Sequence, residues 1–436
     1  MKAKPLYISA IIALSAIIPT ETSAQIWSLD SCINYAISHN INVRTRALDR
    51  MSAELDVTEA KDRFLPELNA GVSQSFNFGR GLTSENTYAN RNTSQFGWNV
   101  GVSVPLFQGL SAVRRLNYSR ANLLAITEQY EAAKDDVTLN VISQYLQVLY
   151  CAEIYNVAQE QLKLSQTELQ RRKILLDAGK IPELDLIQAQ SQVAQDELAA
   201  VNAHNDHTLA LLDLSQLLQL PDMEGFDILP VSDSEMPLLS AEQVYDNALQ
   251  HNHSVLASQH ALTAADKNIT LAKSGYLPRL SFNAGLSSSY YKLYGEPNPP
   301  FHRQMRDNFN KSLGFTLSIP IFDAFTTRNS VRKAKVQRLN AELQLDDTRT
   351  RLYKSINQAY YQAVAANKKR QSSAVAREAT YAALQAMQEK YNYGKANATE
   401  YDQAKTDYIR AASEAVQAKY ESILRTRILE FYNRTY

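Results

Sequence analysis

Two short segments of this sequence share the residues most able to do chemistry. They read LDAGKIPELDLIQA at 176–189 and YNYGKANATEYDQA at 391–404. Each contains a Gly-Lys dipeptide, at Gly179-Lys180 and at Gly394-Lys395. Six residues after its glycine, each segment has a carboxylate, Asp185 in the first and Glu400 in the second. A carboxylate at the start of a helix stabilises the helix dipole, which is one interpretation of both acids.

Other candidates for catalysis or metal binding are weak. His204 and His207 are three residues apart, and His251 and His253 are two apart, but neither pair has a third ligand at a supporting spacing. The chain has no HExxH, GxSxG, P-loop or Cys-His signature. The acidic pairs at 135–136 and 346–347 correspond between the two halves, which favours solvated or tunnel-facing charge. We therefore expect no enzyme activity, no cofactor and no metal site.

The composition excludes one class of partner. Lys plus Arg and Asp plus Glu both number 45, so the net charge is zero, whereas a nucleic-acid binder normally carries a basic excess. Cys32 and Cys151 have no metal-binding spacing. They are expected to be two buried thiols, and a disulfide between them is left open.

Residues 1–24 have the features of a secretory signal peptide. Lys2 and Lys4 precede an apolar run over 7–18, and Thr22-Ser23-Ala24 offers small residues for cleavage. The next residue is Gln25, so the lipoprotein signature, a cysteine at this position, is absent. We expect an exported protein without a lipid anchor and, because no later run has 18 apolar residues, without a membrane-spanning helix.

The mature sequence is an internal duplication. AKDRFLPEL at 60–68 matches AKSGYLPRL at 272–280, and VSVPLFQ at 102–108 matches LSIPIFD at 317–323. These matches place Pro66 on Pro278 and Pro105 on Pro320 at expected junctions between helices and strands. We expect a first structural repeat over 25–221, an acidic linker over 222–237 and a second repeat over 238–436. Each repeat should contain a short helix, a helix, two strands, a long helix, a tip and a return helix.

Four windows without Gly or Pro predict very long helices. They are 111–178, 183–220, 325–393 and 396–434. Leu162, Leu169 and Leu176 belong to a seven-residue apolar spacing, which is typical of coiled-coil packing. In each repeat the return helix is shorter than the long helix and can cover only part of it. An earlier helix, at about 43–65 in the first repeat and 254–276 in the second, has the length needed to pack beside the part that is left uncovered.

Four segments with period-two alternation predict strands. They are 68–79, 94–107, 280–294 and 309–322. Segments of this length with aromatic ends match outer-membrane strands. Four strands cannot close a membrane barrel, so other copies of the chain must complete it. The polar segments 79–92 and 293–308 are expected to be the connecting loops.

With these features in this order, the chain resembles the TolC-like outer-membrane efflux proteins. The resemblance rests on the duplication, the Leu-Pro helix ends, the VPLFQG and IPIFDA strand ends and the two Gly-Lys segments. It implies a mainly α fold with a membrane β-barrel. Four strands per protomer would join a shared twelve-stranded trimeric barrel in the outer membrane, and long coiled-coil helices would form an α-barrel tunnel across the periplasm.

The resemblance also implies a function. Such a homotrimer is a passive exit duct of a tripartite efflux or secretion system, as in multidrug efflux or type I secretion. Its implied partners are outer-membrane lipid, a periplasmic adaptor protein and an inner-membrane pump, from which it conducts small molecules or polypeptides to the outside. The alternative is an exported structural coiled-coil protein without channel activity.

The resemblance further assigns a gate to the periplasmic helix tips. Asp185 and Glu400 match acidic tip positions, and Asp402 lies beside a second acidic position that is Gln403 here. Tyr391 matches a tyrosine that holds the closed state by contacting the first-half acid. Symmetry would turn each acid into a ring that attracts cations in a narrow pore.

The match at the tips is incomplete. A basic position of the family is Ala396 here, with Lys395 beside it, so the closing network is expected to be weaker or differently wired. The two tip turns, Gly179-Lys180 and Gly394-Lys395, are either adaptor contacts or plain solvated turns.

Overall fold

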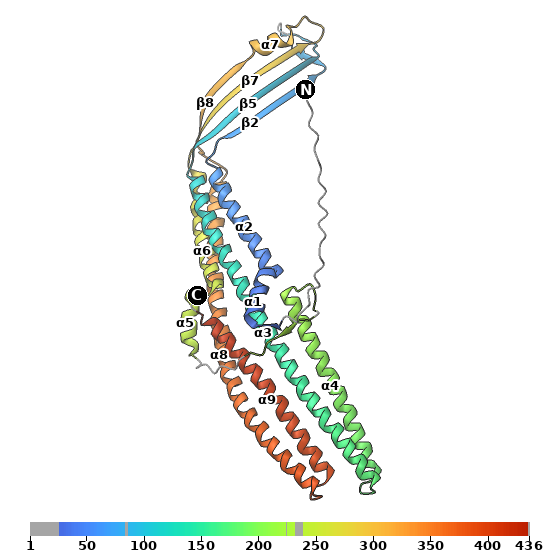
Figure 1. Cartoon of the computed structure of the whole chain (residues 1–436). Helices are drawn as coiled ribbons and strands as arrows, with labels where there is room; N and C mark the ends of the chain where they lie inside the picture. Colours follow the sequence, from blue (N-terminus) through green and yellow to red (C-terminus); the bar gives the residue numbers. More distant parts are fainter. Residues whose placement is uncertain (1–25, 83–85, 224, 232–238, 435–436) are drawn as a thin grey trace, which may run out of the picture. The chain divides into compact units, whose positions relative to one another are not determined.

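The computed structural model describes residues 26–82, 86–223, 225–231 and 239–434 (Figure 1). The predicted signal peptide and part of the predicted linker (residues 224 and 232–237) lie outside these residues. The chain forms two compact units, each of which draws on both predicted repeats. Unit 1 contains Met1–Ala36, Val141–Ser234 and Ser373–Tyr420, and unit 2 contains Ile37–Asn140, Glu235–Ser372 and Glu421–Tyr436.

The long helices confirm the windows predicted from Gly and Pro. They are α3 (Ser111–Asp177), α4 (Glu183–Leu218), α8 (Thr326–Asn392) and α9 (Ala398–Tyr432). The shorter helices are α1 (Leu29–His39), α2 (Ile41–Asp62), α5 (Ala241–His251) and α6 (His253–Ala272), the last continued by a 3-10 turn, η1 (Lys273–Tyr276). Among the described helices, none combines the length and apolar character needed to cross a membrane.

A four-stranded antiparallel sheet in unit 2 confirms the predicted strands. Its order is β2 (Glu67–Asn77), β5 (Thr93–Gln108), β7 (Arg279–Leu293) and β8 (Asn310–Ser318). The expected loop 79–92 contains a small hairpin of β3 (Arg80–Leu82) and β4 (Tyr88–Asn90), and the expected loop 293–308 contains helix α7 (Phe301–Asp307). In unit 1, β1 (Ile26–Trp27) pairs in parallel with β6 (Asp227–Ile228).

The strand register gives the sheet two opposite faces, because residues directly paired across antiparallel strands point to the same side. The apolar face carries Leu68, Ala70, Val72, Phe96, Trp98, Val100, Val102, Val104, Phe282, Ala284, Leu286, Leu313, Phe315 and Leu317. The polar face carries Asn69, Gly71, Ser73, Ser75, Asn77, Thr93, Gln95, Gly97, Asn99, Gly101, Ser103, Ser281, Asn283, Gly285, Ser287, Ser289, Asn310, Ser312, Gly314, Thr316 and Ser318. Two charged side chains share this face, Glu67 and Arg279, which are the first residues of β2 and β7. Tyr291 and Leu293 share it near the opposite end of β7.

The four prolines predicted at helix–strand junctions occupy different places. Pro66 lies between α2 and β2, and Pro278 lies between η1 and β7. Pro105 is inside β5, where the register shifts between Pro105 and Phe107. Phe107 rather than Leu106 therefore pairs with Leu280. The alternation predicted for 94–107 is thus interrupted after Pro105. Pro320 follows the end of β8.

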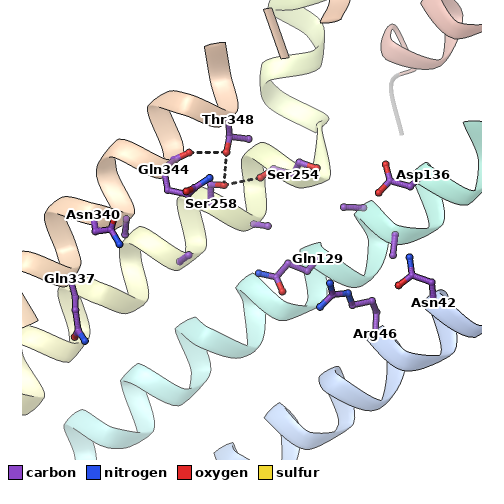
Figure 2. A pocket seen from close by; sticks show the side chains of 15 residues that line it. Asn42, Arg46, Gln129, Asp136, Ser254, Ser258, Gln337, Asn340, Gln344 and Thr348 are labelled. Atoms are coloured by element: carbon purple, nitrogen blue, oxygen red, sulfur yellow. Dashed lines mark hydrogen bonds between the residues drawn. The ribbon is translucent and has the colours of Figure 1, made fainter. Parts of the chain in front are cut away.

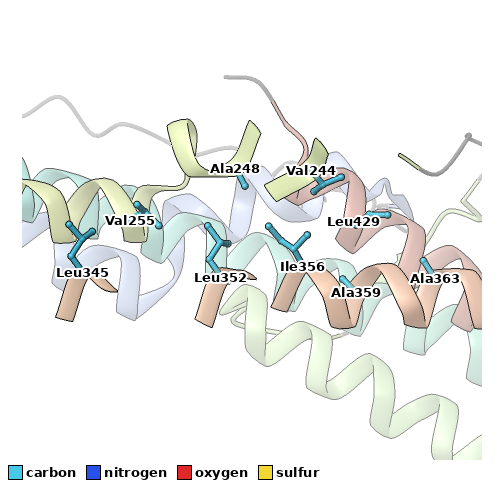
Figure 3. Packing of buried hydrophobic residues seen from close by; sticks show 9 residues of the cluster. All are labelled: Val244, Ala248, Val255, Leu345, Leu352, Ile356, Ala359, Ala363 and Leu429. Atoms are coloured by element: carbon cyan, nitrogen blue, oxygen red, sulfur yellow. The ribbon is translucent and has the colours of Figure 1, made fainter. Parts of the chain in front are cut away.

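Unit 2 has a core in which α5, α6, α8 and α9 meet (Figure 3). Its buried members are Val244, Ala248, Val255, Leu345, Leu352, Ile356, Ala359, Ala363 and Leu429. Leu345, Leu352 and Ala359 are seven residues apart along α8, as knobs-into-holes packing requires. The apolar seam of α8 therefore joins its neighbouring helices in the way that the heptad spacing predicts.

In unit 1, the side chain of Tyr145 joins the long helix α3 to the small parallel sheet. Its hydroxyl donates to the carbonyl oxygens of Trp27 (3.1 Å) and Leu229 (2.6 Å). Cys32 and Cys151 are buried free thiols, which answers the question of a disulfide left open by the sequence.

Candidate functional site

The two Gly-Lys turns of unit 1 have the same backbone structure. Gly179 and Gly394 both have φ of +69°, a left-handed conformation that glycine adopts at little cost. Lys180 N–H donates to Leu175 O (2.9 Å), and Lys395 N–H donates to Lys390 O (2.8 Å). With the N–H of each glycine bonded three residues back, these are two Schellman caps. The repeated dipeptide thus ends α3 and α8 in the same way, and both lysines are exposed.

The two acids that follow these turns have local roles in the chain. Glu400 accepts the N–H of Asn397 (3.0 Å), and Asn397 Oδ1 accepts the N–H of Glu400 (2.8 Å). This reciprocal pair is a capping box at the start of α9. Asp185 is in the first turn of α4, where a carboxylate suits the helix dipole. Its main-chain carbonyl oxygen accepts a hydrogen bond from Arg172 Nη1 at 3.5 Å.

The centre of the tip is Arg172, a buried arginine of α3 that is 2% exposed. Its Nε lies 3.0 Å from Glu168 and its Nη2 lies 3.0 Å from Asp402 of α9. Burial alone lowers the pKa of Arg172, but the hydrogen bonds and charges of Asp402 and Glu168 outweigh it and raise the pKa. A charge-assisted network therefore fastens α3 to α9 within one chain.

Tyr391 of α8 joins the same network. Its hydroxyl donates to Glu168 (3.1 Å), so the partner is Glu168 and not the predicted first-half acid, Asp185. Arg171 lies over the Tyr391 ring (4.6 Å), and the ring stacks on Tyr401 with centroids 5.1 Å apart. Burial, and then the charge of Glu168, raise the pKa of Tyr391, so its hydroxyl stays protonated and donating at neutral pH.

A second polar cluster lies further along α3 and α4. Asp196 of α4 accepts hydrogen bonds from Ser165 and from Gln161 (3.2 Å) of α3. Lys405 Nζ of α9 is 3.8 Å from Asp196, and both side chains are almost fully buried. Burial lowers the pKa of Lys405, against the opposing charge of Asp196. This cluster ties the same helices as Arg172 does.

Of the residues predicted for a gate, the structure brings Tyr391 and Asp402 together around Arg172 and Glu168. Arg172 and Glu168 were not predicted, although the sequence carries a signal for Arg172. Ser165 and Arg172 are seven residues apart, each three after a heptad leucine, so they stand where a coiled coil has apolar core residues. A charge at such a position indicates a polar network instead of packing.

Unit 2 has a polar hollow of about 580 Å³ (Figure 2). Its lining comes from α2, α3, α6 and α8 and consists mainly of amides, hydroxyls and alanines. Ser258 bonds to Thr348 (3.2 Å) and to the carbonyl of Ser254 (3.0 Å), while Arg46 and Asp136 are the charged lining residues. The hollow resembles the polar face of the sheet in carrying mostly uncharged hydrogen-bonding groups. In the described residues, no group of three His, Cys, Asp or Glu side chains could hold a metal.

Known proteins are similar in sequence to this chain along most of its length. The family model for outer membrane efflux proteins matches residues 32–219 and 244–427. The outer membrane efflux protein BepC of Brucella suis is 23% identical over 427 residues, covering 97% of this chain and 88% of BepC. The outer membrane protein TolC of Vibrio cholerae is 24% identical over 354 residues, covering 79% of this chain and 75% of TolC.

Solved structures share the fold. The CmeC outer membrane channel of Campylobacter jejuni has a TM-score of 0.77 at 16% identity, with 93% of this chain and 85% of CmeC covered. The open state of the MtrE outer membrane channel of Neisseria gonorrhoeae has a TM-score of 0.75 at 16% identity, with 93% and 91% covered. Since the family model matches both halves of the sequence, this chain belongs to the outer membrane efflux protein family.

Proposed function

We propose that this protein is a homotrimeric exit duct in the outer membrane. Four strands from each of three copies would close a twelve-stranded barrel, and the long helices would continue it as a tunnel in the periplasm. The duct would be passive and would receive its cargo from a periplasmic adaptor protein and an inner-membrane pump. Membership of the outer membrane efflux protein family supports this proposal.

The observation that carries the proposal is the sheet with one apolar and one polar face. In the single chain, Leu68, Val72 and Leu313 are at least 73% exposed. Apart from the end that α7 contacts, no described element covers this apolar band, and an exposed band of this kind suits contact with lipid. The outer edges of β2 and β8 have no strand partner among the described residues, and such edges are costly in a bilayer. Further copies of the chain would satisfy both edges.

The polar face would then line the barrel. It consists mainly of Ser, Asn, Thr and Gln side chains, and glycines on the same face leave room for them. At Gly71, for example, an added Cβ would lie 2.8 Å from Asn99 Oδ1. The only charged residues of this face in the described strands are Glu67 and Arg279, which have opposite signs. A wall with so little net charge would select weakly between anions and cations, so we propose that any ion selectivity arises elsewhere, at the helix tips.

We propose that the tips gate the duct through the Arg172 network. The network fastens the α3–α4 hairpin to α8 and α9 in one protomer, so release of these bonds would let the hairpins separate. The cargo is not specified by these groups. Among relatives, AprF of Pseudomonas aeruginosa is named for alkaline protease secretion and CusC of Escherichia coli for cation efflux.

Membrane extraction and conductance test the proposal. The full-length protein should be extracted by detergent from outer-membrane fractions as a trimer, and the purified trimer should conduct ions in planar bilayers. A water-soluble monomer without conductance would refute the duct and favour the exported structural coiled-coil protein.

A further inference from the structure

Helix α7 has a fixed place at the end of the sheet remote from α2 and α6 (Figure 1). Strand β8 begins at Asn310, which pairs with Ser287, so β7 continues beyond the last β8 partner. The side chain of Gln304 takes over that edge, because it accepts the N–H of Tyr291 and donates to its carbonyl, both at 3.0 Å. Asn308 adds a bond to Ser289 O (2.7 Å). Helix α7 therefore replaces the missing end of β8.

Helix α7 also packs against the apolar face of the sheet. The Phe301 ring contacts Tyr290 (5.1 Å between centroids) and Phe96 (5.7 Å), and both belong to the apolar-face register. On that face, Ser288 Oγ donates to Met305 O at 2.6 Å. Phe301, Gln304 and Met305 contact the sheet, whereas the other residues of α7 are exposed and point away from it.

Those outward residues are mainly cationic. The Arg303 and Arg306 side chains are 66% and 77% exposed. They share one carboxylate, that of Asp307, at 3.5 Å and 2.9 Å respectively. Two guanidinium groups on one carboxylate leave one positive charge in excess, and His302 is exposed beside them.

Two lysines of the strands add positive charge on the face that α7 contacts, at two levels of the sheet. Lys311 pairs with Leu286, and Lys292 pairs with Ser94, which places both on the apolar-face register. Lys311 Nζ lies over the Phe309 ring (5.7 Å), as expected of a cation that reaches from an apolar surface towards water. We call Lys292, Arg303, Arg306 and Lys311 the basic rim. Leu313, Phe315 and Leu317 of the apolar band follow Lys311 along β8.

We propose that the basic rim binds the phosphate groups of outer-leaflet lipid, with α7 lying at the membrane surface. The proposal rests on the proposed function, which puts the apolar band in lipid and this end of the sheet at the outer surface. Cations directly beyond an apolar band meet lipid headgroups, and guanidinium groups form bidentate bonds to phosphate. The occupant is a phosphorylated glycolipid of the lipid A type, because charge complementarity requires an anionic headgroup and Phe301 offers its acyl chains an apolar neighbour.

Lipid binding to the purified full-length trimer tests this inference. Native mass spectrometry would measure the Kd for lipid A carrying two phosphates in wild type and in an Arg303→Gln/Arg306→Gln variant. Each basic group near a headgroup contributes roughly a fivefold change in affinity, so the variant should bind on the order of twentyfold more weakly. The Arg303→Lys/Arg306→Lys variant should keep most of the affinity.

The chain offers a matched control on α8. Arg351 is 76% exposed and lies 2.9 Å from Asp347, almost as Arg306 lies from Asp307, and Arg349 pairs with Asp346. The Arg349→Gln/Arg351→Gln variant should bind lipid A as wild type does. Equal binding by the α7 variant, equal binding of lipid A stripped of phosphate, or binding of inorganic phosphate as tight as that of the lipid would overturn the inference.

Conductance separates this inference from the proposed function. If wild type is a conducting trimer while the α7 variant binds lipid A normally, only the lipid site is wrong. If wild type neither inserts in bilayers nor forms a trimer, the proposed function fails, and the lipid site fails with it.

Discussion

Replacing Asp402 by asparagine should open the duct by removing one arm of the Arg172 network. The substitution keeps the size of the side chain and removes its charge. Arg172 Nη2 donates to the two carboxylate oxygens of Asp402 at 3.2 and 3.0 Å. Arg172 would retain Glu168, so no buried charge is left without a partner and the tip should still fold.

The expected loss of free energy follows from how far the Asp402 side chain is buried. A hydrogen bond to a charged group contributes about 1.5–3 kcal/mol. Because the Asp402 side chain is 46% exposed, solvent screening reduces this to about 1 kcal/mol in each protomer. That change shifts the ratio of open to closed tips by about fivefold per protomer. Arg172→Met would have a larger effect, about 3–5 kcal/mol, but it would remove the main cationic partner of largely buried Glu168, which would keep only the Tyr391 hydroxyl and Arg171 at 3.8 Å.

Single-channel recording in planar bilayers measures the shift as a higher open probability or conductance. The matched control is Asp407→Asn on the same helix. The Asp407 side chain is 45% exposed, and it pairs with Arg410 at 3.9 Å within α9, so it joins no two helices. Wild-type conductance in Asp402→Asn, or an equal increase in Asp407→Asn, would refute a gating role for the Arg172 network.

Substitutions at three further positions test local roles of individual side chains. Glu400→Gln should preserve the capping box with Asn397 and the conductance, whereas Glu400→Ala should cost roughly 0.5–2 kcal/mol of stability in thermal unfolding; a loss of cation preference in the glutamine variant would instead favour an acidic ring. Burial raises the pKa of Tyr145 to about 12, above its ordinary value near 10, so the stability it supplies is complete below about pH 10 and is lost as the pH rises towards 12. Tyr145→Phe should lower stability by about 1–3 kcal/mol at neutral pH and weaken that alkaline loss, as measured by circular dichroism melting from pH 8 to 11.5; an unchanged pH profile would contradict this. Ile356→Ala, at a fully buried position, should cost about 2–5 kcal/mol and Ile356→Val about 0.5–1.5 kcal/mol in denaturant unfolding, and equal costs would show that the core relaxes around the site.

The sequence by itself determined the elements. Gly and Pro break helices, so the windows without them ended within two residues of α3, α4, α8 and α9. Alternation located the four strands because side chains alternate between the two faces of a sheet. The repeated Gly-Lys dipeptide gave two equal caps, since the left-handed backbone after a helix depends on one local residue.

Tertiary structure alone decided which charged groups meet. Arg172 and Asp402 are 230 residues apart, and no local rule links their side chains. The first-half partner of Tyr391 is likewise Glu168, which precedes the tip turn, and not Asp185, which follows it. Helix α7 formed in a segment expected to be a loop because Gln304 and Ser288 fasten it to the edge of β7. Local propensity follows from neighbours in the chain, whereas the choice of ionic partner follows from how distant helices align.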